Sequence, residues 1–215
     1  MTFTLQPGGH NREAQHCARI HGTLERSPTA KRETTPIGSV EWTRCHAVWV
    51  SVHLPDMPTY PAELWPWLGR NVRTAVFSDA AWHDFVKPIR CKAFTGAIRS
   101  EVTELVSPGE PVWICEPVQF VAEWRLYILR GRVATWAQYG EGDDAEPDLA
   151  AVAQMLQAWP GPAGWALDVG RLDDGRQVLV EANDGWALGF YKGADPVAYL
   201  EVISARWAEL AGRQS

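Results

Sequence analysis

The sequence predicts an α+β fold in which antiparallel hairpins are covered by helices. Two tight turns, Arg130-Gly131 and Asp174-Gly175, each separate two runs rich in apolar and β-branched residues, and strands joined by such short turns pair antiparallel. Two further segments, 147–160 and 195–212, carry an apolar stripe at helical spacing. Because a helix with one apolar stripe must pack on another element, the pattern favours an α+β architecture.

Composition indicates a folded domain without a nucleic-acid partner. The 215 residues are 46% hydrophobic and 11% aromatic, which suffices for one sizeable domain or two small lobes that share a core. A net charge of −6 gives no electrostatic reason to expect DNA or RNA as a partner. The cysteines form no CxxC pair, so neither a zinc site nor a disulfide framework is predicted: Cys17, Cys45, Cys91 and Cys115. No signal peptide or membrane-spanning apolar run is evident, and we expect a cytoplasmic protein.

The other elements follow from local patterns. Residues 1–35 are polar and irregular, and we expect them to form a loosely ordered lead or a short decorating element. A short helix is expected over 59–69, with Pro61 in its first turn. The final helix has an N-cap at Asp195, proline at its first position and a glycine stop. Strands are expected over the following segments: 47–54, 84–89, 111–118, 122–129, 132–139 and the two arms of a hairpin within 165–183.

Three oxygen-bearing side chains meet on one face of the second hairpin. If Asp174 and Gly175 form a two-residue turn, the numbers of paired residues sum to 349, so Asp168 lies opposite Glu181. Asn183 then points from the same face, since side chains alternate along a strand. The other face should be core, and it carries Leu167, Val169, Val178 and Val180.

Two carboxylates directly opposed on a sheet repel each other, and something must offset that repulsion. A bound divalent cation does so, and carboxylate with amide oxygens suits Mg²⁺. The alternative is an acidic, solvated sheet end that Arg171 or Arg176 neutralises. On this hairpin alone the sequence favours the cation site.

Basic residues elsewhere indicate an anion site. Lys87 lies within the apolar strand "DFVKPI", where a lysine is either aimed at an anion or lies with its stem on apolar surface. Lys92 follows in "KAFTG", a segment with glycine that is typical of a mobile loop. In "EWRLYIL", Glu123, Arg125 and Tyr127 share the polar face, and arginine can bind phosphate bidentately. A cross-strand salt bridge on a solvated face is the alternative for this strand.

Together these motifs resemble the ATP-grasp superfamily, from about Gly38 to Trp207. "FVKP", "ICEPV", the acid seven residues after Glu116, and the Asp…Glu-x-Asn set occur in the order of that superfamily. "TPIGSVEW", "YPAELW", "KPIRCKAFTG", "EWRLYI" and "VEANDGWALGFY" are similar to a small stand-alone clade named for one arginine and two lysines. The resemblance implies two lobes of antiparallel sheet with packed helices and a nucleotide held between them. It also implies a reduced N-terminal lobe over 36–83 and an ATP-grasp core over 84–215.

The resemblance also implies roles for individual residues. Adenine would bind main chain at a hinge, at the Glu116 carbonyl and the Val118 N–H, because Pro117 has no N–H to donate. Glu123 would accept from the ribose hydroxyls. ATP and Mg²⁺ are the implied cofactors, with Lys87, Lys92 and Arg125 on the phosphates, and Arg125 and Lys92 as catalytic groups. The implied metal ligands are Asp168, Glu181 and Asn183. The candidate substrate contacts are Trp186, Tyr191 and Lys192. Lys192 is also an alternative for one of the two lysine roles.

The implied activity is that of an ADP-forming, ATP-dependent carboxylate–amine ligase. It would work through an acyl phosphate on a small molecule or peptide, with neither nucleic acid nor membrane as partner. Two alternatives stay open on the sequence alone. One is an ATP-dependent phosphotransferase at the same site, and the other is a non-catalytic nucleotide-binding module.

Overall fold

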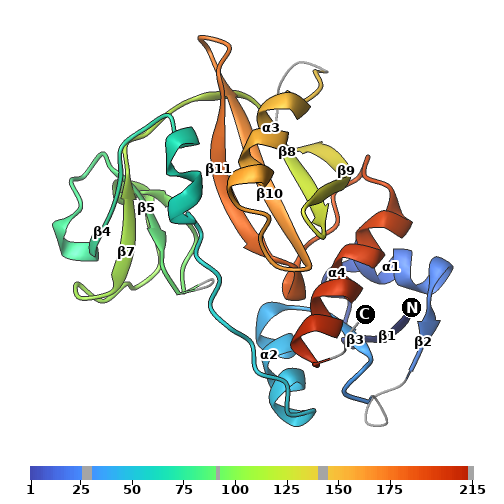
Figure 1. The fold of residues 1–215 in the computed structure, drawn as a ribbon. Coiled ribbons are helices and arrows are strands. Elements are labelled where there is room, and N and C mark those ends of the chain that lie inside the picture. Colours follow the sequence, from blue (N-terminus) through green and yellow to red (C-terminus); the bar gives the residue numbers. More distant parts are fainter. Residues whose placement is uncertain (26–30, 91–92, 140–144, 213–215) are drawn as a thin grey trace.

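The computed structural model describes residues 1–25, 31–90, 93–139 and 145–212, which build three sheets (Figure 1). A three-stranded sheet has the order β2-β1-β3, and two four-stranded sheets have the orders β4-β7-β5-β6 and β11-β10-β8-β9. Both four-stranded sheets are antiparallel throughout, as the hairpin pattern predicted. No helix in the described ranges combines the length and the apolar character that a membrane span needs.

Residues 1–25 and 31–37 contain the three-stranded sheet, in a region where we expected a loosely ordered lead or a short decorating element. Strands β1 (Thr2–Leu5), β2 (Thr23–Leu24) and β3 (Thr35–Ile37) pair in parallel, and α1 (Arg12–His21) connects β1 to β2. The buried residues of α1 are small or polar, so its sequence shows no apolar stripe. Buried Gln15 satisfies its amide by donating to the carbonyls of Gln6 and His10.

The expected strand over 47–54 is wrong, because its first three residues end helix α2 (Val40–Trp49) and the rest forms no strand. Ser39 caps this helix, and its side chain accepts a hydrogen bond from the Trp42 N–H at 3.2 Å. Helical spacing governs burial, since the buried residues are Val40, Thr43, His46 and Ala47. Val48 and Trp49 are exposed, so the apolar run that suggested a strand lies partly in solvent.

The middle of the chain forms a small lobe. It contains β4 (Val72–Val76), β5 (Phe85–Pro88), β6 (Ala97–Ile98) and β7 (Pro111–Cys115), together with two single-turn helices, η2 (Phe77–Asp79) and η3 (Arg99–Glu101). The predicted strands at 84–89 and 111–118 are thereby confirmed. The predicted helix at 59–69 is a 3₁₀ helix, η1 (Ala62–Trp67), with Pro66 inside it. Proline lacks the N–H that an α-helix would use there.

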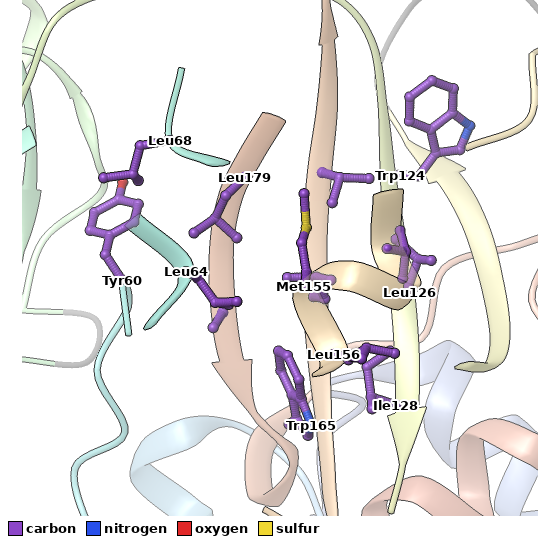
Figure 2. Packing of buried hydrophobic residues seen from close by; sticks show 14 of the residues in the cluster. Tyr60, Leu64, Leu68, Trp124, Leu126, Ile128, Met155, Leu156, Trp165 and Leu179 are labelled. Carbon is purple, nitrogen blue, oxygen red and sulfur yellow. The ribbon is translucent and has the colours of Figure 1, made fainter. Parts of the chain in front are cut away.

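A larger lobe follows. Its strands are β8 (Phe120–Leu129), β9 (Arg132–Tyr139), β10 (Gly164–Leu172) and β11 (Gln177–Asp184), and its helices are α3 (Leu149–Ala158), η4 (Gly185–Ala187) and α4 (Pro196–Leu210). Arg130 and Gly131 both have positive φ, as expected for a tight hairpin turn. On one face of the sheet, α3 and η1 bury a cluster that includes Leu64, Leu126 and Met155 (Figure 2). Helix α4 covers part of the other face.

The register of the second hairpin was predicted correctly at its functional end and incorrectly near its turn. Asp168 pairs with Glu181, as expected. However, Val169 pairs with Leu179, so Val180 is an extra residue that forms a β-bulge. Leu179 and Ala182, rather than half-buried Val180, therefore join Leu167 and Val169 in the core cluster.

Candidate functional site

A cleft of about 540 Å³ lies between the small lobe and β11. Segments 87–89 and 93–96 line it from the small lobe, and residues 181–184 with Trp186 line it from the large lobe. Residues 55–57 and 59, which precede η1, form a further wall. The volume falls within the range of about 300–1,000 Å³ that small-molecule sites usually have.

The sheet register brings the predicted charged residues into one row. Arg125 of β8 is the neighbour of Asp168 on β10, and Asp168 is the neighbour of Glu181 on β11. All three positions therefore lie side by side on the same face. Asn183 joins them, because its amide donates to Oδ2 of Asp168 at 3.1 Å.

Arg125 and Asp168 form a buried, bidentate ion pair. Arg125 Nε donates to Asp168 Oδ1 at 2.8 Å and Nη2 donates to Oδ2 at 2.6 Å. The Arg125 guanidinium also lies 4.8 Å from the ring centroid of Tyr191. Burial works to lower the pKa of Arg125, but the charge and hydrogen bonds of Asp168 outweigh it and raise that pKa. Arg125 is thus charged at neutral pH.

Lys87 extends from β5 across the cleft and forms an ion pair with Glu181. This contact joins the two lobes, since β5 belongs to one four-stranded sheet and β11 to the other. Burial lowers the pKa of Lys87 to about 8, and the nearby charge of Asp168 offsets that effect in part. The lysine therefore begins to lose its charge only slightly above neutral pH.

The predicted metal ligands have suitable chemistry but are paired with cations. Asp168, Glu181 and Asn183 present carboxylate and amide oxygens, the ligand types that Mg²⁺ prefers. In the structure Arg125 neutralises Asp168, and Lys87 neutralises Glu181. Within the described ranges, no three His, Cys, Asp or Glu side chains gather as a metal site by themselves. The donor set has the chemistry that suits Mg²⁺, and its assignment as the metal site stays a prediction.

The predicted hinge residues connect the two lobes. Glu116, Pro117 and Val118 lie between the end of β7 and the start of β8. The Glu116 N–H donates to the Asn71 carbonyl at 2.9 Å, and its carboxylate accepts from the Asn71 amide at 3.3 Å. The side chain of Glu116 is therefore anchored beside β4. Its assigned contact with adenine, like that of Val118, stays a prediction.

Glu123, the predicted ribose ligand, is held by a tyrosine from the neighbouring strand. Tyr139 donates its hydroxyl to Glu123 at 3.1 Å, and the two residues are partners in the β8–β9 register. Burial raises the pKa of Glu123, while the hydrogen bond from Tyr139 opposes that rise. Tyr139 was not among the predicted site residues. The two-residue turn alone would place Gln138 opposite Glu123, and a register shift between Tyr127 and Ile128 brings Tyr139 there instead.

The candidate substrate contacts have different surroundings. Trp186 is buried and lines the cleft, and Tyr191 is half-buried over Arg125. The hydroxyl of Tyr127 fixes this loop by accepting from the Tyr191 N–H and donating to the Gly189 carbonyl, both at 2.9 Å. Lys192 is exposed. Lys92 lies outside the residues that the structure describes.

Two arginines near the site were missed from the sequence. Arg206 of α4 donates to both carboxylate oxygens of Asp184 at 2.7 Å, and burial raises the pKa of Asp184 while Arg206 opposes the rise. Arg206 follows buried Ile203 at helical spacing and precedes Trp207, and a charge on a buried stripe could have signalled a buried partner. Arg70 donates to main-chain carbonyls of β11, and no local pattern indicated that contact.

Comparison with known proteins confirms the predicted fold. Residues 67–202, well over half of the chain, match the family model for the ATP-grasp domain of family 2 in the clade named for one arginine and two lysines. Among solved structures, the chain resembles D-cycloserine synthetase DcsG at 15% identity and a TM-score of 0.60, covering 96% of this chain and 100% of that one. It resembles a RimK domain ATP-grasp protein from Sphaerobacter thermophilus at 14% identity and a TM-score of 0.55, covering 97% and 98% of the two chains.

A third similar structure is N5-carboxyaminoimidazole synthase from Aspergillus clavatus, solved with ADP and 5-aminoimidazole ribonucleotide. It is 11% identical with a TM-score of 0.53, and the match covers 100% of this chain and 77% of that one. No curated protein matches the sequence. At such identities the structural likeness establishes the fold, while the family model goes further. The chain belongs to the ATP-grasp domains, in family 2 of the clade named for one arginine and two lysines.

Proposed function

We propose that the protein is an ATP- and Mg²⁺-dependent carboxylate–amine ligase that works through an acyl phosphate on a small molecule or peptide. The observation that carries the proposal is the pairing of two cations with two neighbouring carboxylates. Lys87 pairs with Glu181 in the cleft between the lobes, and Arg125 pairs with Asp168, which is buried beside Glu181. An ATP-grasp fold that places both charge types there can accept the magnesium salt of a nucleotide.

The ion pairs provide a charge-neutral exchange. Removing one partner from a buried ion pair leaves an unpaired charge, which is strongly unfavourable. With a nucleotide and Mg²⁺ both bound, Lys87 and Arg125 would hold the phosphates. Asp168, Glu181 and the Asn183 amide would hold the metal. Each charged side chain would then keep an oppositely charged partner, so we expect nucleotide and metal to bind with strong positive coupling.

The chain's own residues can support acyl transfer without a protein nucleophile. In the proposed reaction a substrate carboxylate oxygen attacks the γ-phosphorus of ATP, and ADP leaves. An amine then attacks the acyl carbon, and inorganic phosphate leaves as the C–N bond forms. Arg125 and Lys87 would neutralise negative charge on the phosphoryl group during transfer. Bound Mg²⁺ would supply further charge neutralisation on the phosphate oxygens.

The similar structures support a small-molecule substrate. The D-cycloserine synthetase and the carboxyaminoimidazole synthase are named for small products, and the latter was solved with ADP. Trp186 at the wall of the cleft would help to exclude water from the reacting groups, which protects an acyl phosphate from hydrolysis.

A thermal-shift titration tests the site first. Wild type should gain stability with ADP and Mg²⁺ together, by about 2.7 kcal/mol when ligand is present at a hundredfold its dissociation constant. Glu181→Gln should respond weakly, because it removes one metal ligand. Glu110→Gln is the matched control, since Glu110 also pairs with a cation, Arg90, but outside the cleft. A wild type that does not respond to ADP with Mg²⁺ contradicts the proposal.

Turnover assays then identify the reaction. ADP release that requires both a carboxylate and an amine supports the ligase. A stable phosphorylated product formed without an amine points instead to a phosphotransferase. Nucleotide binding without ADP release over a broad panel of carboxylates and amines points to a binding module.

A further inference from the structure

The β-bulge at Val180 decides which face of the sheet carries Glu181. Side chains alternate along a regular strand, so residues 179 and 181 would share a face without an extra residue. Leu179 is fully buried in the core cluster, whereas Glu181 faces the cleft. The bulge between the pairs Asp168–Glu181 and Val169–Leu179 makes this difference. A strand without it would send Glu181 to the core side or Leu179 to the cleft.

A bulge needs support, because it leaves main-chain groups without ladder partners. Here Arg70 supplies that support from outside the sheet. Its Nη1 donates to the Leu179 carbonyl at 2.8 Å, and its Nη2 donates to the Val180 carbonyl at 3.1 Å. Successive carbonyls of a regular strand point in opposite directions, so one planar guanidinium reaches both only where the strand is irregular. The contact is thus specific to the bulged conformation.

Arg70 is itself held in place from several sides. Its Nη1 also donates to the Leu68 carbonyl at 3.0 Å, and its guanidinium lies 5.7 Å from the Tyr60 ring and 5.8 Å from the Phe120 ring. Gly69, with φ of +62°, brings the chain against Val178, where a Cβ would collide. Nearby, the Thr59 carbonyl accepts from the Ala182 N–H at 2.9 Å. Residues 59–70 therefore run along the open edge of β11.

We propose that Arg70 is a positioning residue for the metal site, acting through Glu181. It stabilises the bulge that turns the Glu181 carboxylate toward Lys87, Asp168 and Asn183. The inference rests on the proposed function, because Glu181 matters in this way only if it binds the metal. If Arg70 only joined the lobes, its removal would weaken nucleotide binding equally with and without metal. A positioning role predicts a loss only when metal is present.

The experiment compares ADP dissociation constants in EDTA and in Mg²⁺ for wild type, Arg70→Met and Arg70→Lys. Arg70→Met should lose roughly 10- to 100-fold of the Mg²⁺-dependent gain in affinity, the usual effect of removing an outer-shell partner of a metal site. Its ADP affinity in EDTA should stay unchanged. Arg70→Lys keeps the charge but lacks the planar guanidinium, so its Mg²⁺-dependent gain in ADP affinity should lie between those of wild type and Arg70→Met. This variant replaces Arg70→Met in the test if the methionine variant does not fold. Arg73→Met is the matched control, an exposed arginine of the neighbouring strand β4.

Two further measurements separate positioning from general damage. Hydrogen exchange of peptides that cover 178–184 should accelerate in Arg70→Met, while peptides within α4 stay protected. Adding Glu181→Gln to Arg70→Met should remove no more of the Mg²⁺-dependent gain than Glu181→Gln alone, because both changes act on the same ligand.

The outcomes separate this inference from the proposed function. A wild type without a Mg²⁺-dependent gain overturns both. A wild type with the gain, and an Arg70→Met variant that keeps it, overturns the positioning role alone. Equal losses in EDTA and in Mg²⁺ also overturn it, since Arg70 would then only join the lobes.

Discussion

The large lobe contains two buried, bidentate arginine–aspartate pairs, one at Asp168 of β10 and one at Asp184 of β11, and the two pairs differ in their surroundings. Arg125–Asp168 has donor–acceptor distances of 2.8 and 2.6 Å, and Arg206–Asp184 has 2.7 Å for both. The side chains are about equally inaccessible, at 10% and 1% exposure in the first pair and 8% and 9% in the second. Geometry and burial alone would therefore give the two pairs the same role.

Their neighbours separate them. Asp168 lies beside Glu181 and Asn183, which are further oxygen donors, and its arginine packs against the ring of Tyr191. Asp184 instead accepts from the Trp186 N–H, and Arg206 also donates to Glu209, so this pair ties the end of β11 to helix α4. An ion pair can exchange partners only where alternative partners are within reach. We conclude that the first pair is suited to ligand exchange and the second to holding the fold.

The largest expected effect is on stability at the second pair. Arg206→Met leaves the buried Asp184 carboxylate without its partner and should lower the free energy of unfolding by about 3–5 kcal/mol. Urea denaturation measures this, and Arg206→Met combined with Asp184→Asn should recover most of the loss because no unpaired charge remains. A loss below about 1 kcal/mol, the size typical of exposed pairs, would contradict the fold-holding role.

The next effect is a rescue by metal that only the first pair should show. Arg125→Met removes the arginine partner of Asp168, so this variant should be less stable than wild type in EDTA. The Asp168 carboxylate should then be able to bind a cation together with Glu181 and Asn183. Saturating Mg²⁺ should then restore about 2.7 kcal/mol at a hundredfold the dissociation constant. Thermal unfolding with EDTA and with Mg²⁺ measures it, with Arg206→Met as the comparison. Equal responses of the two variants would show that the two ion pairs do not differ in their capacity to exchange partners.

The smallest effect concerns the pH dependence of ADP binding through Lys87, a cleft residue whose pKa lies near neutral. Burial lowers its pKa from 10.5 to about 8, so its charge is lost as pH rises through about 8. ADP affinity should fall about threefold between pH 7.5 and 8.5 if only charged Lys87 binds phosphate. Stability should move the opposite way, rising between pH 8 and 10.5, since there the unfolded chain binds more protons than the native one.

Lys87→Arg keeps its charge throughout this range and should show a flat ADP profile, which isothermal titration at several pH values can measure. A flat profile in wild type would instead show that Lys87 stays charged or does not contact the nucleotide.

Local chemistry explains which parts of the fold were predictable. The Arg130-Gly131 turn and the cap at Asp195 are set by neighbouring residues, and both formed as expected. The pairing of Asp168 with Glu181 was predicted correctly, although the turn length assumed in that prediction was wrong. The real turn contains one residue more than assumed, and the bulge at Val180 compensates for that difference.

The remaining parts depend on contacts distant in sequence. Helix α1 buries Gln15 through hydrogen bonds that only the folded loop provides, so its polar sequence resembled an unstructured lead. Within the site, residue types indicated phosphate and metal chemistry. They could not show that Lys87 and Glu181 pair with each other, because the two residues belong to different lobes.

The bonds between Asn71 and Glu116 have a mechanical consequence. The chain passes between the lobes twice in this region, after Arg70 and again after Glu116, and these bonds hold the two passages side by side. The junction is thus a two-stranded ribbon, which continues into the paired strands β4 and β7 (Figure 1). Such a ribbon bends readily out of its plane but resists shear within it. Opening of the lobes should therefore follow one rotation axis across the ribbon, so that Lys87 leaves and returns to Glu181 along a repeatable path.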